Sequence, residues 1–221
     1  LDAIQSTIDL LEGQPLSKSD FEFSLSGNDS GSLHLSDKGV GNKLTIDDAQ
    51  LLQNLQKVQT LNELGESENL NLVKIGEAEA SFPNFSIEME TGTGKTYVYL
   101  RSIYELNKTY GFKKFVIVVP SVAIREGVLK NLQITHDHFQ EIYENVPTNF
   151  QVYDSKKLAG LANFSRSNTI QILVINIDSF TKDTNIINQV RERGIKPIEY
   201  IQSANPIVIM DEPQNMETEI R

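Results

Sequence analysis

The sequence has no cysteine among its 221 residues. This absence excludes disulfide bonds and cysteine-based zinc sites, and it suits a cytoplasmic location. A long hydrophobic run is also missing. The longest one, residues 115–124, is interrupted by Pro120 and Ser121 and has about half of the roughly 20 residues that a membrane helix needs. The first 13 residues carry acids where a signal peptide has a basic start, so we expect no signal peptide.

The sequence has fewer basic than acidic residues. The sequence has 20 lysines and arginines against 30 aspartates and glutamates, which gives a formal net charge of −10. A protein that binds DNA over a broad surface is usually basic, because neutralisation of phosphates supplies most of the non-specific affinity. We therefore expect this chain by itself to bind DNA weakly, through a few local contacts.

The length fits one large domain, or one domain with a small insertion. Residues 1–13 are expected to form an opening helix, because apolar residues recur at helical spacing before Gly13. Residues 14–80 are rich in polar loop-forming residues and are expected to form an insertion of mixed strand and helix. Residues 81–221 have a more regular pattern and are expected to form the main domain.

The insertion contains two local signals. Short alternating stretches at 21–25 and 33–35 predict a hairpin between polar loops. Thr45 and Asp48 have the spacing of a capping box and predict the start of a helix that continues to about Leu64. The sequence therefore predicts a small α+β insertion.

Short apolar runs alternate with helical segments in the remainder of the chain. The candidate strands are residues 85–89, 115–119, 150–153, 170–175 and 207–210. Helices fit between them at residues 95–110, 122–139 and within 185–201. This alternation predicts an α/β fold with a parallel sheet that is covered by helices on both faces.

Residues 89–96 form the first chemical motif, Met-Glu-Thr-Gly-Thr-Gly-Lys-Thr, between a predicted strand and a predicted helix. Gly92 and Gly94 allow the backbone to turn so that its N–H groups can surround phosphate oxygens. The helix that starts near Lys95 adds its positive end. Lys95 can reach the β- and γ-phosphates of ATP, and the hydroxyl of Thr96 can bind Mg²⁺.

This motif has Met89 where the general phosphate-loop pattern has glycine. The alternative interpretation is a glycine-rich loop that merely joins a strand to a helix. A Gly-Lys-Thr triplet between a strand and a helix favours the phosphate loop.

A second motif begins where the apolar run 207–210 ends at Asp211 and Glu212. Taken alone, two acids after a strand are most often a solvated strand end. Together with the phosphate loop, 116 residues earlier when counted from Asp211 back to Lys95, they predict a Mg–ATP site at the carboxyl edge of the sheet. The aspartate would hold Mg²⁺, and the glutamate would polarise the attacking water.

These motifs resemble known sequences. Residues 90–96 and 211–214 resemble motifs I and II of superfamily 2 helicases, and the Asp-Glu-Pro-Gln form of the second is similar to the restriction subunits of type III restriction–modification enzymes. Residues 118–127 resemble motif Ia, and residues 174–180 resemble the next strand and its nucleic-acid-facing loop. The resemblance implies a RecA-like fold of the P-loop NTPase class and the first motor domain of a helicase-type ATPase.

The resemblance also implies roles for individual residues. It assigns triphosphate binding to six loop residues: Thr91, Gly92, Thr93, Gly94, Lys95 and Thr96. Lys95 would contact the β- and γ-phosphates, and Thr96 with Asp211 would hold Mg²⁺. Glu212 would activate water, and Gln214 would couple the ATP site to the DNA side or to a second motor domain.

Partners follow from the same resemblance. In the family, these subunits use ATP to move along double-stranded DNA or to change state while bound to it. They cut the DNA only in complex with a methyltransferase subunit that recognises the site. A helicase motor also has a second domain with an arginine that completes the ATP site, and these subunits carry a nuclease domain. Because both would lie outside residues 1–221, we expect this chain to bind nucleotide weakly and to hydrolyse it poorly; such an arginine is worth about 10³–10⁵ in rate.

Pro120, Ser121 and Arg125 are candidate contacts to the DNA backbone, because a turn with a hydroxyl and free backbone N–H groups suits phosphates. The alternative is that Ser121 caps a helix and Arg125 is a surface residue. For the whole chain, two other interpretations remain. One is a small-molecule kinase with the same phosphate loop, and the other is a non-catalytic nucleotide-binding module.

Overall fold

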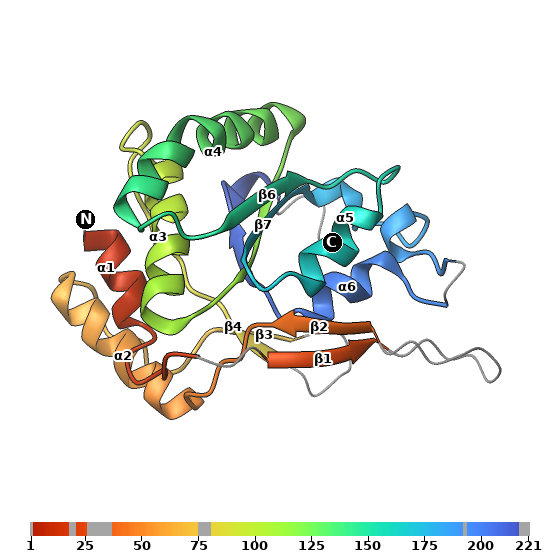
Figure 1. Cartoon of the computed structure of the whole chain (residues 1–221). Coiled ribbons are helices and arrows are strands. Elements are labelled where there is room, and N and C mark those ends of the chain that lie inside the picture. The colour runs from red at the N-terminus through yellow and green to blue at the C-terminus, as the bar shows by residue number, and fades with distance from the viewer. Residues whose placement is uncertain (1, 18–20, 26–36, 75–80, 192–193, 217–221) are drawn as a thin grey trace. The chain divides into compact units, whose positions relative to one another are not determined.

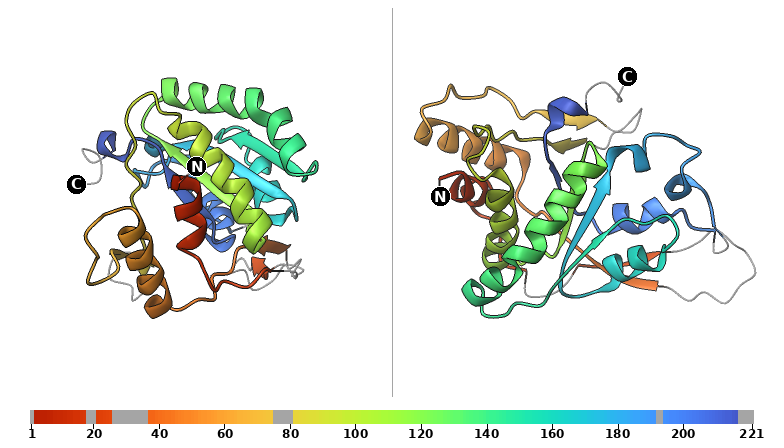
Figure 2. Two further views of the ribbon diagram at one scale, coloured as in Figure 1. Left: turned by 90° about the vertical axis from the view of Figure 1, so that its left-hand side faces the viewer. Right: turned by 90° about the horizontal axis from the view of Figure 1, so that it is seen from above.

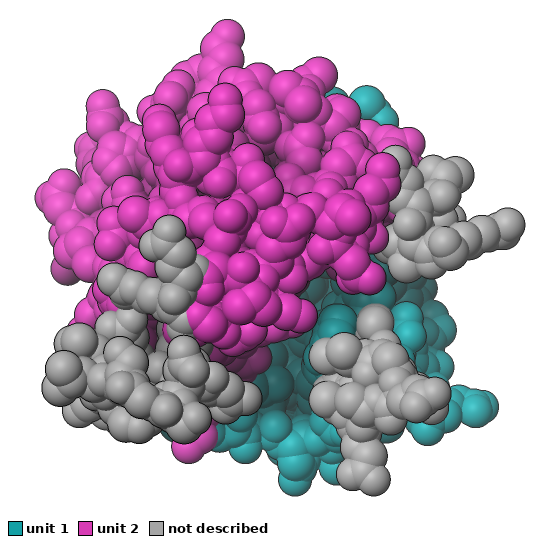
Figure 3. Space-filling model, turned by 90° about the vertical axis from the view of Figure 1, so that its right-hand side faces the viewer, with its two compact units in different colours: residues 1–16, 44–110 teal, residues 17–43, 111–221 magenta. Residues whose placement is uncertain are grey.

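The computed structural model describes residues 2–17, 21–25, 37–74, 81–191 and 194–216. The chain divides into two compact units, coloured separately in Figure 3. The first consists of Leu1–Leu16 and Leu44–Tyr110, and the second of Ser17–Lys43 and Gly111–Arg221. In the described residues, no helix combines the length and the apolar character needed to cross a membrane.

The first unit is mainly helical. Its elements are α1 (Asp2–Asp9), α2 (Asp48–Leu61), β3 (Leu72–Lys74), β4 (Ser81–Pro83) and α3 (Lys95–Tyr110). Helix α1 packs on α3, where Ile4 is buried and the Tyr110 hydroxyl donates a hydrogen bond to the Ile8 carbonyl oxygen at 2.8 Å. The side chain of Asn54 on α2 donates to the carbonyl oxygens of Leu10 and Glu12 and so ties α2 to the end of the opening segment.

The second unit contains the central sheet. Its strands are β5 (Lys114–Val119), β6 (Thr148–Val152), β7 (Ile170–Asn176) and β8 (Ile207–Met210). All neighbours are parallel, in the order β6-β7-β5-β8 (Figure 1). An antiparallel hairpin of β1 (Phe21–Leu25) and β2 (Asp37–Gly41) belongs to the same unit.

Helices cover both faces of this sheet, as predicted. On one face, Val116 and Leu173 belong to a buried cluster that includes residues of α5 (Ala159–Arg166) and α6 (Pro197–Ser203). Strand side chains alternate between faces, so the buried Ile117 points to the opposite face, where α4 (Val122–Ile142) packs on β5 and β7. The views in Figure 2 show α4 on one side of the sheet and α5 with α6 on the other. The predicted α/β, RecA-like parallel sheet is therefore confirmed.

Lys114, at the start of β5, is completely buried. Its ammonium group donates hydrogen bonds to the carbonyl oxygens of Phe164 and Ser167 at the end of α5, and it lies 5.6 Å from the centre of the Phe164 ring. The Asn42 side chain donates to the Lys114 carbonyl oxygen and accepts from the backbone N–H groups of Lys113 and Lys114. These contacts attach the segment after the hairpin and the end of α5 to the start of the central strand.

Several local predictions were wrong. Residues 85–89 are irregular rather than a strand, and Ile87 is 52% exposed; a short apolar run forms a strand only where it pairs with a neighbour. The N-cap of α2 is Asp47, which accepts from the Gln50 N–H, and not Thr45, whose backbone N–H and hydroxyl donate to Gln14. The predicted strand at 33–35 lies outside the described residues.

Candidate functional site

The phosphate loop belongs to the first unit. Gly92 and Gly94 have φ angles of 82° and 87°, in the left-handed region that favours glycine, and no atom lies within 4 Å of a Cβ built on either. Lys95 and Thr96 are the first two residues of α3, and the Val98 N–H donates to the Gly94 carbonyl oxygen at 3.0 Å. Open space, a turning backbone and a helix N-terminus are the features that suit an anion such as phosphate.

Thr93 stabilises the turn before this helix. Its hydroxyl donates to the Glu90 carbonyl oxygen at 2.6 Å, and its N–H donates to the same oxygen at 3.4 Å. Residues 90–94 are exposed, and Lys95 and Thr96 are half-buried. The loop is therefore accessible to a ligand from solvent.

The carboxylate motif belongs to the second unit. Asp211 continues the parallel ladder beyond β8, because its N–H donates to the Val118 carbonyl oxygen at 3.0 Å. Glu212 then has φ 56° and ψ 57°, a left-handed conformation that costs a residue with a side chain about 1–3 kcal/mol. Its Oε2 atom accepts a hydrogen bond from the Asn215 side chain at 2.9 Å. Gln214 is exposed in the short 3-10 helix Pro213–Asn215 that follows.

The candidate DNA-contacting residues follow β5. Ser121 caps α4, because its hydroxyl accepts from the Ile124 N–H at 3.3 Å. The Arg125 guanidinium is paired with its neighbour Glu126, through Nε at 3.2 Å and Nη2 at 2.8 Å from the same carboxylate oxygen. The helix-cap alternative for Ser121 is therefore present in the structure.

The structure brings two of the predicted motifs together. Val118 on β5 pairs with Met210 on β8, so the Pro120–Ser121 turn and Asp211 lie at the same carboxyl edge of the sheet. This is the edge where open α/β sheets bind their ligands. The phosphate loop belongs to the other unit.

Two polar residues at this edge were not predicted. Asn176 ends β7, opposite Val119, and is only 8% exposed; its side-chain oxygen has no hydrogen-bond partner among the described residues. Asn215 holds the Glu212 carboxylate. Asn176 could have been found from the sequence, because it is an asparagine at the end of an apolar run. The contact between Asn215 and Glu212 depends on the turn after β8.

One titratable group at this edge has a shifted pKa. Burial raises the pKa of the Tyr153 phenol, just after β6, above its usual value; Arg191 opposes this rise and Asp154 adds to it.

The donor atoms of the predicted metal site suit Mg²⁺ in kind, because the Thr96 hydroxyl and the Asp211 carboxylate are hard oxygen ligands. No group of three or more histidine, aspartate or glutamate residues that could hold a metal occurs in the part of the chain that the structure describes. A Mg²⁺ ion bound through phosphates and water needs only one or two protein carboxylates.

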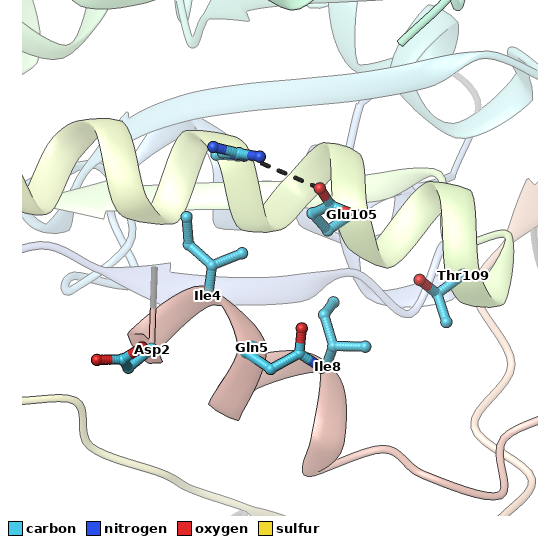
Figure 4. A pocket seen from close by; sticks show the side chains of 7 residues that line it. Asp2, Ile4, Gln5, Ile8, Glu105 and Thr109 are labelled. Atoms are coloured by element: carbon cyan, nitrogen blue, oxygen red, sulfur yellow. Dashed lines mark ion pairs between the residues drawn. The ribbon is translucent and has the colours of Figure 1, made fainter. Parts of the chain in front are cut away.

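The first unit also has a cavity of about 380 Å³ between α1 and α3 (Figure 4). Asp2 and Gln5 lie on its α1 side, and Arg101 pairs with Glu105 across one turn of α3, with 3.9 Å between Nε and Oε1. None of the predicted site residues lines this cavity. Its nearby charges include both signs, which does not suit a triphosphate.

Comparison with known proteins gives related sequences. The chain is 41% identical over 155 residues to the Res subunit of the type III restriction–modification enzyme StyLTI of Salmonella typhimurium strain LT2, an alignment that covers 59% of this chain and 15% of the relative. It is 29% identical over 201 residues to the EcoP15I Res subunit of Escherichia coli, covering 80% of this chain and 20% of the relative. It is 23% identical over 159 residues to the mitochondrial ATP-dependent RNA helicase MRH4 of Lodderomyces elongisporus, covering 63% of this chain and 25% of the relative.

This chain therefore spans a quarter or less of the length of each of these relatives. The family model described as "Type III restriction enzyme, res subunit" matches residues 47–218, which include the phosphate loop, the Pro120–Ser121 turn and the carboxylate motif. The chain belongs to the family of type III restriction enzyme res subunits, as a helicase-type motor domain.

Proposed function

We propose that this chain binds Mg–ATP and forms the first motor domain of a DNA-dependent translocase within a type III restriction enzyme. The observation that carries the proposal is the left-handed backbone of Gly92 and Gly94 immediately before α3. A turning backbone with space around both glycines, followed by a helix N-terminus, suits phosphate binding.

The residue roles are as follows. The loop Thr91–Gly94 would surround the phosphates, and Lys95 would contact the β- and γ-phosphates. Mg²⁺, held through Thr96 and Asp211, would neutralise charge on the phosphate oxygens. Glu212 would accept a proton from water, whose oxygen bonds to the terminal phosphorus as the bond from that phosphorus to the bridging oxygen of ADP breaks. Gln214, exposed beside Glu212, would transmit this change to the DNA side.

Double-stranded DNA is the proposed partner at the carboxyl edge of β5. Pro120, Ser121 and Arg125 would contact its backbone. Since Arg125 is paired with Glu126 and the chain is acidic, this contact is expected to be weak without the rest of the enzyme. A methyltransferase subunit, a second motor domain and a nuclease domain would supply site recognition, the remaining ATP contacts and DNA cleavage.

A Glu212→Gln variant tests the proposed chemistry, because glutamine keeps the shape of the side chain and removes the base. We expect Mg–ATP binding equal to that of the unchanged chain, and phosphate release reduced at least tenfold. Release that is unchanged in Glu212→Gln would overturn the role of this residue. Transfer of phosphate to a small-molecule acceptor rather than to water would favour a kinase instead.

A further inference from the structure

We infer that Asn215 is a positioning residue that holds the carboxylate of Glu212 in one orientation. This inference rests on the proposed role of Glu212 as the base that activates water. Its structural basis is the hydrogen bond of 2.9 Å from the Asn215 side-chain nitrogen to Glu212 Oε2, across the turn that follows β8.

The backbone of this turn is fixed at both ends. Before it, the Asp211 N–H donates to the Val118 carbonyl oxygen and so holds the chain to the central strand β5. After it, Met216 is 2% exposed and belongs to the buried cluster between the sheet and helices α5 and α6. The turn itself is closed by the Asn215 N–H, which donates to the Glu212 carbonyl oxygen at 3.0 Å.

Glu212 has a conformation that glutamate rarely adopts. At φ 56° and ψ 57°, its backbone is in the left-handed region, where glycine or asparagine is more favourable. Strain of this kind clusters at functional sites, although Glu63 and Glu144 have it as well. The turn therefore holds a glutamate at a position where a turn-forming residue would be less strained.

The chemistry of the contact suits a base. A carboxylate has two oxygens that accept hydrogen bonds, and the Asn215 amide occupies only Oε2. A carboxamide N–H donates but does not take up a proton at neutral pH, so it orients the carboxylate without competing for the proton of the water. Without this donor, the half-buried side chain of Glu212 would be free to leave the orientation in which it meets that water.

The contact can be separated from a structural role of Asn215. The backbone hydrogen bond that closes the turn needs no side chain, so it persists in any variant other than proline. Asn215→Asp keeps the shape of the side chain and replaces the donor with an acceptor. Asn215→Ala removes the side chain, and Asn215→Ser restores a shorter donor. Asn163→Asp, at an exposed position on α5, is the matched control for the added charge.

The first experiment measures single-turnover phosphate release, with the whole chain in excess over Mg–ATP and above the dissociation constant, together with the Mg–ATP dissociation constant of each variant. We expect Asn215→Asp and Asn215→Ala to lower the rate at least fivefold with an unchanged dissociation constant. Asn215→Ser should recover part of the rate, and Asn163→Asp should leave it unchanged. A rate for Asn215→Asp equal to that of the unchanged chain would overturn the inference, because this variant lacks the donor.

A second measurement tests the contact without catalysis. In ¹⁵N-labelled protein, the side-chain amide signal of Asn215, assigned by its loss in Asn215→Ala, should move in Glu212→Ala and stay in place in Lys95→Ala. A signal that stays in place in Glu212→Ala would overturn the inference. If Glu212→Gln releases phosphate as fast as the unchanged chain, the inference fails with the role of Glu212. If Lys95→Ala binds Mg–ATP as tightly as the unchanged chain, the proposed ATP site itself fails. The amide signal of Asn215 does not depend on that site.

Discussion

The buried ammonium group of Lys114 donates a hydrogen bond to the backbone carbonyl oxygen of Phe164, which joins the start of β5 to the end of α5. The last carbonyl groups of a helix have no partner within the helix, and a buried one must find a donor elsewhere. Lys114 supplies this donor for Phe164 and also for Ser167. A charged residue thus stabilises the interior of the sheet that carries the site.

Replacement of Lys114 by methionine should destabilise the protein. Methionine fills similar space, but it leaves the carbonyl oxygens of Phe164 and Ser167 without their donor. We expect the free energy of unfolding, measured with urea, to fall by about 2–4 kcal/mol. Lys113→Met is the control, because the ammonium of Lys113 contacts Asn168 in an exposed position, and it should change the free energy by less than about 1 kcal/mol. Equal effects of the two substitutions would contradict this role of Lys114.

Glu212→Asn should separate stability from activity. Asparagine tolerates the left-handed backbone at position 212, so the substitution should raise the free energy of unfolding by about 0.5–1 kcal/mol, or leave it unchanged, while phosphate release is lost. Glu144 has the same backbone region, with φ 55°, and lies beyond α4. Glu144→Asn should raise stability similarly and leave Mg–ATP binding unchanged. A fall in stability of more than about 1 kcal/mol in Glu212→Asn would mean that the backbone is not strained.

Gly94→Ala should weaken nucleotide binding without unfolding the chain. The backbone at φ 87° is strained for alanine by about 1–2 kcal/mol, which corresponds to about tenfold weaker binding if the loop must keep this shape around phosphate. Gly65→Ala is a suitable control, since Gly65 has no positive φ and no atom within 4 Å of an added Cβ. Titration calorimetry with Mg–ATP distinguishes them. Equal affinity of the two variants would argue against a role of the loop backbone.

Glu126→Gln should strengthen binding to double-stranded DNA. In the structure, the Glu126 carboxylate accepts hydrogen bonds from the Arg125 guanidinium, the group that is proposed to contact a DNA phosphate. An exposed ion pair of this kind is worth about 0.2–1 kcal/mol, so we expect an increase in affinity of about two- to fivefold. Arg125→Gln should weaken binding and reduce the slope of log affinity against log salt concentration by about one. Fluorescence anisotropy with a labelled duplex measures both, and an unchanged affinity in Arg125→Gln would exclude this contact.

The order of the central elements could be predicted from the sequence because a parallel sheet leaves a strong pattern. The strands β5 and β7 are buried on both faces and appear as nearly continuous apolar runs, and α3 occupies the predicted residues 95–110. The left-handed backbone of the phosphate-loop glycines was also predictable, since few other residues adopt these φ angles.

Features that depend on distant partners could not be predicted. The strand at 85–89 was predicted from its composition, but pairing decides whether such a run becomes a strand. Lys114 gave no signal of burial, because its partners lie 50 or more residues away on α5 and beyond it. The hydrogen bond between Asn215 and Glu212 depends on the turn after β8, which the motif alone does not specify.

The most direct test of the proposed ATP site is a calorimetric titration of the chain with Mg–ATP, beside Lys95→Ala and Lys108→Ala. Lys108 is an exposed residue in the last turn of the same helix, so its variant controls for the loss of one positive charge from α3. If the phosphate loop binds ATP, the unchanged chain and Lys108→Ala bind Mg–ATP, and Lys95→Ala binds it at least tenfold more weakly or not at all. Binding of equal affinity in all three proteins would contradict an ATP site at the phosphate loop.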